Sequence, residues 1–133
     1  MANLAEGAEI SLTVPGDGAY TIVLRTALGG VAVAADLGVD ALDDLRMATD
    51  EACDCLLHQE KRVSRLCMRV RAAEDALTVS LQAELGACGG EKCGDRVAIC
   101  RTILETLIPK VSFETEPCGC VSRIDLTMPR HGL

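Results

Sequence analysis

In the first part of the chain, apolar residues recur at two different spacings. Residues 10–14 alternate apolar and polar side chains and end at a Pro-Gly-Asp-Gly turn, which predicts a strand. Residues 20–34 place apolar side chains three and four positions apart, as one face of a helix does, although Gly29 and Gly30 weaken that helix. Asp40 is the expected N-cap of a second helix. The apolar stripe of this helix comprises Leu42, Leu45, Ala48, Ala52 and Leu56.

A change of period follows the second helix. Residues 66–70 and 77–83 alternate with period two on either side of a short turn, which predicts a hairpin with one buried face. Residues 85–94 contain four glycines and two cysteines, and this composition is typical of a loop.

The last part of the chain predicts a helix and two strands. Asp95 is the expected N-cap of the helix, which ends before Pro109. Residues 111–115 and 124–128 alternate as strands do, and Gly119 supplies the backbone angle that the turn between them needs. The apolar stripe of the helix comprises Val97, Cys100, Leu104, Leu107 and Ile108.

The predicted element order, β-α-α-β-β-α-β-β, defines an α/β (α+β) fold class. Five amphipathic strands and three amphipathic helices bury their apolar faces most simply as a two-layer sandwich, with the helices on one face of a mixed, mostly antiparallel sheet. A chain of 133 residues is long enough for one core and too short for two. We therefore expect a single domain over residues 1–133.

Composition narrows the class of protein. Twenty acidic and 13 basic side chains give a net charge of −7, which disfavours nucleic acid as a partner. The chain shows neither a secretory signal nor an apolar run long enough for a bilayer, so we expect a cytoplasmic protein that does not bind membranes. In that compartment the eight cysteines are expected to be buried thiols, metal ligands or redox groups rather than disulfides.

The first two predicted helices carry the most specific pattern. Residues 25–32 read Arg-Thr-Ala-Leu-Gly-Gly-Val-Ala, and residues 44–58 read Asp-Leu-Arg-Met-Ala-Thr-Asp-Glu-Ala-Cys-Asp-Cys-Leu-Leu-His. In this order they resemble the anti-sigma-factor serine kinases, a branch of the histidine kinase-like (GHKL) ATPase superfamily. The resemblance is specific over residues 22–58 and implies the histidine kinase-like ATPase fold for nearly the whole chain.

The resemblance also implies a nucleotide pocket, from which this sequence departs. Glu51 matches the family's glutamate, which acts as general base or orients the attacking group. Cys55 stands where the family has the asparagine that binds magnesium, and a thiol is a poor ligand for that cation. The family's adenine-binding aspartate and glycine-rich lid have no counterpart here. We expect a degenerate site with Glu51, Cys55 and His58 as residual cofactor-binding residues and Glu51 as the one catalytic candidate.

These departures favour an anti-sigma-factor-like regulatory protein that acts in transcription control without ATP turnover. The resemblance implies a sigma factor or an antagonist protein as its partner, and a homodimer as its assembly. No cofactor is then expected, whereas the family itself uses ATP and magnesium. The alternative is an active ATP-dependent serine/threonine protein kinase, so whether the chain is an enzyme stays open at this point.

A third hypothesis is a cysteine-based metal or redox sensor. On the family fold Cys55 would face the old nucleotide pocket, and Cys88, Cys93 and Cys100 would border it. Four such thiolates could bind a soft metal such as zinc, with His58 as a further candidate ligand. The spacing matches no known zinc finger, and buried cysteines also fill cores as small apolar side chains.

The charges are segregated along the chain. The second predicted helix is acidic, and a basic cluster follows it. The acidic residues are Asp40, Asp43, Asp44, Asp50, Glu51 and Asp54, and the basic ones are Lys61, Arg62, Arg65, Arg69 and Arg71. The simpler interpretation is charge balance on solvated faces, and the functional one is a bipolar surface for protein partners.

Overall fold

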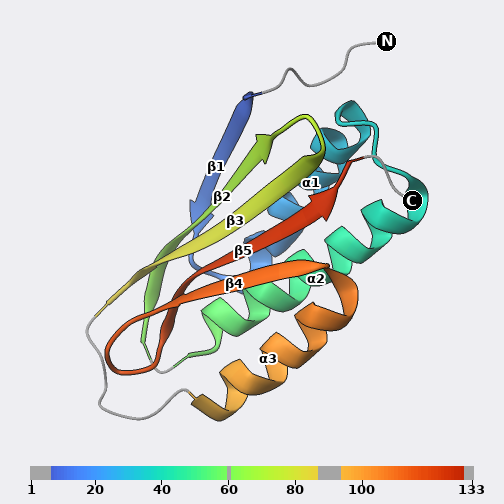
Figure 1. The fold of residues 1–133 in the computed structure, drawn as a ribbon. Helices are drawn as coiled ribbons and strands as arrows, with labels where there is room; N and C mark the ends of the chain where they lie inside the picture. The colour runs from blue at the N-terminus through green and yellow to red at the C-terminus, as the bar shows by residue number, and fades with distance from the viewer. Residues whose placement is uncertain (1–6, 60, 87–93, 131–133) are drawn as a thin grey trace.

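The computed structural model describes residues 7–59, 61–86 and 94–130. They form an α+β fold in which a five-stranded sheet carries three helices on one face (Figure 1). The elements are β1 (Glu9–Pro15), the 3₁₀ turn η1 (Gly18–Tyr20), α1 (Thr21–Ala34), α2 (Val39–Leu57), β2 (Val63–Ala72), β3 (Ala76–Leu85), α3 (Gly94–Leu107), β4 (Lys110–Thr115) and β5 (Val121–Pro129). The predicted element order and the two layers are confirmed. Among the described residues, no helix has the length and apolar character that crossing a membrane requires.

The sheet has the strand order β1-β2-β3-β5-β4, and all four neighbouring pairs are antiparallel. The prediction of a mixed sheet is therefore wrong. The reason lies in the connection through α3, because β3 and β4 run in the same direction but do not pair. β5 lies between them and is antiparallel to both.

Alternation along the strands buries one face of the sheet, as predicted for the hairpin. Met68 of β2 lies opposite Leu12 of β1 and Leu81 of β3, and Leu81 lies opposite Ile124 of β5. Met68, Leu81 and Ile124 are at most 1% exposed. This row of apolar side chains contributes the sheet's half of the core beneath the helices.

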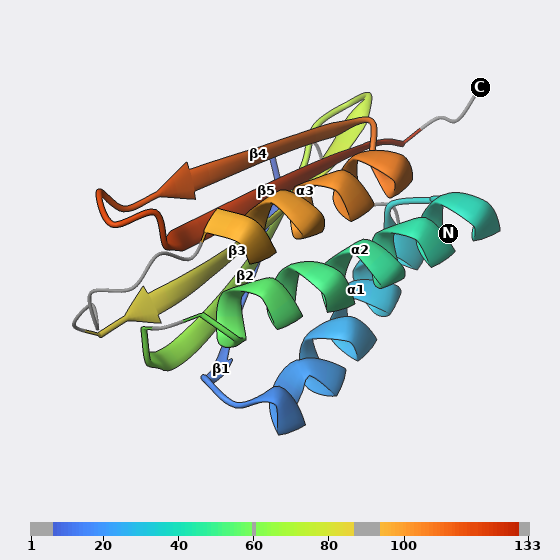
Figure 2. The same ribbon diagram turned by 90° about the horizontal axis from the view of Figure 1, so that it is seen from below.

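The helix layer consists of α1, α2 and α3 side by side, with α2 in the middle (Figure 2). The predicted α2 stripe is buried from Leu45 to Leu56, but the N-cap is Gly38 rather than Asp40. Asp40 lies in the first turn, where its charge still favours the positive end of the helix dipole. Tyr20 of η1 and Val23 of α1 fit the apolar period predicted for residues 20–34, but they are 41% and 42% exposed, because α1 buries a narrower stripe than that pattern suggested.

α3 and the turn after β4 follow the sequence pattern closely. Cys100, Leu104 and Ile108 of the predicted stripe are buried. The helix already begins at Gly94, so Asp95 lies inside it rather than at its N-cap. The predicted glycine turn is confirmed, since Gly119 has φ +93°, a region that disfavours side chains.

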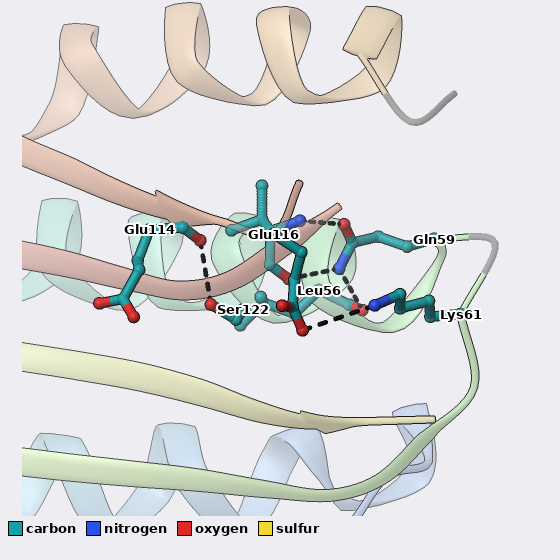
Figure 3. A network of polar contacts seen from close by, with 7 residues as sticks. Leu56, Gln59, Lys61, Glu114, Glu116 and Ser122 are labelled. Atoms are coloured by element: carbon teal, nitrogen blue, oxygen red, sulfur yellow. Dashed lines mark hydrogen bonds and ion pairs between the residues drawn. The ribbon is translucent and has the colours of Figure 1, made fainter. Parts of the chain in front are cut away.

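Side-chain hydrogen bonds and an ion pair join the residues after α2 to the β4–β5 turn and the start of β5 (Figure 3). The Gln59 side-chain amide donates to the Val121 carbonyl at 2.8 Å and to the Leu56 carbonyl at 3.2 Å, and its oxygen accepts from the Val121 N–H at 2.6 Å. Beside it, the Lys61 ammonium lies 3.5 Å from the Glu116 carboxylate, and the Lys61 side chain is only 10% exposed. Side chains thus fix the α2–β2 connection against a distant turn.

Candidate functional site

The candidate site predicted from the sequence lies on α2. Cys55 is 1% exposed and belongs to the hydrophobic core, whereas Glu51, one turn earlier, is half-buried. The thiol of Cys100, from α3, lies 4.0 Å from the Glu51 backbone carbonyl oxygen, a weak S–H···O contact. α2 and α3 therefore pack directly together at the turn that begins with Glu51.

His58 lies at the C-cap of α2, and its side chain is 60% exposed. Its Nδ1 atom lies 2.8 Å from an Asp54 carboxylate oxygen and 2.9 Å from the Asp54 backbone carbonyl. These contacts orient the imidazole toward solvent and the end of its own helix. The three predicted pocket residues thus occupy different environments: a half-buried carboxylate, a core thiol and an exposed imidazole.

The thiols of the predicted metal set are only partly described. Cys55 and Cys100 are both buried, and Cys88 and Cys93 lie outside the described residues. Within residues 7–59, 61–86 and 94–130, no group of three or more His, Cys, Asp or Glu residues is arranged to bind a metal ion. Cys55 and Cys100 both belong to the hydrophobic core.

Two other cysteines have perturbed acidities in opposite directions. Burial, reinforced by the charges of Asp50 and Asp54, raises the pKa of the Cys53 thiol to about 12. Partial burial also acts to raise the pKa of Cys67, but hydrogen bonds from Thr13, Ser11 and Arg69 and the positive charge of Arg69 outweigh it and leave that pKa below its usual value. The sequence alone did not single out Cys67, because its environment depends on cross-strand neighbours.

The open face of the sheet carries the predicted basic residues of β2. Arg65 lies 2.9 Å from Glu84 across the β2–β3 pair, and Arg71 lies 3.2 Å from Glu9 across the β1–β2 pair. A polar depression of about 410 Å³ lies on this face. Arg65 and Arg71 are thus balanced by carboxylates on neighbouring strands, as the simpler interpretation of the charge pattern holds.

The exposed apolar side chains lie on the opposite layer. Of the large hydrophobic residues that the structure describes as exposed, only Ile10 of β1 belongs to the sheet. The others belong to η1 and the three helices: Tyr20, Ile22, Val23, Val33, Val39, Met47, Ile99 and Ile103. The sequence contained a signal for this surface, since these residues fall between the buried positions of each helix or beside its core stripe.

A groove of about 560 Å³ runs between α1 and α2 on the outer side of the helix layer. It is lined by Ile22, Arg25, Thr26, Asp43, Arg46, Met47 and Asp50. Arg25 and Asp50 form an ion pair of 3.1 Å in it. A Cβ atom on Gly29 would lie 2.9 Å from the Arg46 guanidinium, so the small residue lets Arg46 lie close to α1.

No protein-family model matches the chain, and no curated protein matches it. We therefore infer the function from the geometry and from the sequence pattern of α1 and α2.

Proposed function

We propose that the chain is an anti-sigma-factor-like regulatory protein that binds a sigma factor or an antagonist protein and does not turn over ATP. The proposal includes the histidine kinase-like ATPase fold and a homodimeric assembly, both of which the sequence pattern of residues 22–58 implies. The strand and helix order supports it, since two consecutive helices follow the first strand and carry the two halves of that pattern.

The burial of Cys55 is the observation on which the proposal depends. Its thiol is 1% exposed and is part of the hydrophobic core at the position where the resemblance implies a magnesium ligand. Magnesium requires oxygen ligands in an octahedral arrangement and usually retains several waters. A thiol enclosed by apolar side chains provides neither the ligand nor the room.

Phosphoryl transfer depends on positioning and on neutralising charge with a metal ion. Glu51 alone provides neither, and its backbone carbonyl lies against the Cys100 thiol of α3. By contrast, the helix layer presents the exposed apolar side chains that protein partners commonly cover. A partner-binding role therefore accounts for more of the observed features than a kinase role does.

Two measurements test this proposal. We expect calorimetric titration with magnesium-ATP to show no saturable binding, and incubation with labelled ATP and a candidate antagonist to transfer no phosphate. Tight magnesium-ATP binding with phosphate transfer would establish the kinase alternative. Elemental analysis of protein purified without chelators tests the metal-sensor alternative, which a stoichiometric content of zinc or iron would support.

The partner is tested directly. Sigma factors and small antagonist proteins encoded in the same genome are purified and mixed with the chain, and complexes are measured by calorimetry and by light scattering on a sizing column. We expect one of them to bind with defined stoichiometry to a dimer of the chain. Absence of binding to every candidate contradicts the proposal.

A further inference from the structure

Four exposed apolar residues lie on the three neighbouring helices of the helix layer. Ile22 of α1, Met47 of α2, and Ile99 and Ile103 of α3 are 56%, 58%, 62% and 38% exposed. We call these four residues the helix-layer belt. A belt of this kind differs from isolated surface hydrophobics, because its members belong to three neighbouring helices.

The helices that carry the belt pack side by side. Ile22 and Met47 line the same groove between α1 and α2. On the other side of α2, the Cys100 thiol lies beside the Glu51 carbonyl, one helical turn from Met47. Ile99 and Ile103 are on the same turns of α3 as Cys100, and α3 lies on the side of α2 away from α1 (Figure 2).

The exposed side of α2, in the middle of the helix layer, carries more acidic than basic side chains. Asp40, Asp43, Asp44 and Glu51 of α2 are exposed or half-buried, and none of them has an ion-pair partner within the described ranges. In the groove Asp50 neutralises Arg25, and Arg46 is the one further cation among the lining residues. This surface repels nucleic acid and anionic membranes and attracts a positively charged partner.

We infer that the helix-layer belt is the docking site for a basic amphipathic α-helix of the protein partner. Apolar residues of that helix would pack along the belt, and lysine or arginine side chains beside them would face the α2 carboxylates. Grooves between packed helices accept a further helix in this way, with anchors at every third or fourth position. The inference rests on the proposed function, because it names the partner's chemistry for the same regulator.

A synthetic peptide is a sufficient probe. It is about 18 residues long, or five helical turns, with leucines on one stripe, lysines on the flanks and a fluorescent label. We expect saturable binding by fluorescence anisotropy, weakened about tenfold when the salt concentration rises from about 50 to 300 mM. The same peptide with glutamate in place of lysine should not bind.

Variants of the chain locate the binding surface. Met47→Asp and Ile103→Asp should each weaken peptide binding at least about tenfold, since each adds a charge to the apolar contact. The matched control is Ile10→Asp, which makes the same change at an exposed residue of β1 and should leave binding unchanged. Circular dichroism of every variant establishes that the fold is intact.

Two results overturn the inference. One is equal peptide affinity for the Met47→Asp and Ile10→Asp variants. The other is self-association of the wild-type chain that Met47→Asp abolishes, which would make a second copy the occupant of the belt. If a sigma factor binds the wild type and the Met47→Asp variant alike, the inference fails and the proposed function stands. If peptide binding maps to the belt but no sigma factor or antagonist binds, the inference stands and the proposed function fails.

Discussion

The Gln59 side chain binds both backbone groups of Val121, accepting from its N–H at 2.6 Å and donating to its carbonyl at 2.8 Å. One side chain thereby imitates an adjacent strand at the start of β5, 62 residues away in the chain. Val121 is fully buried, so water cannot replace Gln59 as the hydrogen-bond partner of its N–H and carbonyl.

Gln59→Ala should therefore lower the free energy of unfolding by about 2 kcal/mol, because it leaves buried backbone groups unsatisfied. Gln59→Glu should also destabilise, since a carboxylate accepts from the Val121 N–H but cannot donate to its carbonyl. Urea unfolding measures both. Gln82→Ala, at an exposed position on the open face of the sheet, is the control and should change stability by less than about 0.5 kcal/mol.

Thr49 is fully buried in α2, and its hydroxyl has no hydrogen-bond partner within the described part of the chain. Thr49→Val replaces this hydroxyl with a methyl group of similar shape and should raise the free energy of unfolding by about 1 kcal/mol. Thr49→Ser keeps the hydroxyl, removes a methyl group and should lower stability. If the valine variant is instead less stable than the wild type in thermal and urea unfolding, the hydroxyl has a partner in solution.

The Cys53 thiol makes the free energy of unfolding depend on pH in the alkaline range. Its pKa is about 12 in the folded protein, against 9.0 for an ordinary thiol, because burial and the nearby Asp50 and Asp54 disfavour the thiolate. As the pH rises, the unfolded chain therefore loses this proton before the folded protein does. The stability that the protonated Cys53 contributes is complete below pH 9 and is lost progressively between pH 9 and about 12. The expected slope is at most about 1.4 kcal/mol per pH unit.

Cys53→Ala removes the pH-dependent contribution of this thiol. The difference in unfolding free energy between wild type and variant should therefore shrink as the pH rises from 9. Urea unfolding at several pH values measures it. Other groups titrate in the same range, and subtracting the variant's curve removes their shared contribution. A difference that does not change with pH contradicts the assignment.

Cys67 should be more reactive than Cys53 toward iodoacetamide at neutral pH. Its pKa is lowered by Thr13, Ser11 and Arg69, and the residue is partly exposed, so more of it is present as an accessible thiolate. Mass spectrometry of the alkylated peptides measures the rate at each site.

Arg69→Gln should slow alkylation of Cys67 and shift its pH profile upward, because the variant loses the positive charge that favours the thiolate. Arg65→Gln changes the charge equally on the same open face of β2, at a residue that pairs with Glu84. The two variants should therefore differ. Equal slowing would show that the overall charge of the face, rather than Arg69 itself, governs the thiol.

Local patterns of the sequence were sufficient to predict most elements. The alternation that includes Met68 and Leu81 specifies which face of the hairpin is buried, and Gly119 marks a turn that needs positive φ. The place of β5 between β3 and β4 was not predictable in this way. Its pairing with β3 joins strands that are distant in the chain, and period-two alternation is the same for any order of neighbours.

The candidate site was predictable only in part. The spacing of Glu51 and Cys55 placed both on α2, but their different exposures depend on how α3 packs. Met47 and Ile103 were missed because a pattern of apolar residues does not distinguish a buried stripe from an exposed one beside it. The acidity of Cys67 depends on Arg69 and on residues of β1, so it becomes visible only when the strands are paired.

The position of β5 has a consequence for the order of folding. β3 and β4 each hydrogen-bond to β5 and not to each other, so a chain folded only as far as β4 has two separate unpaired strand edges. The β4–β5 hairpin closes only a short turn, but pairing β5 with β3 closes a long loop that contains α3, and this entropy cost slows that step. Until β5 docks, the exposed edge of β3 can pair with another chain, so aggregation is most favoured in this interval of folding.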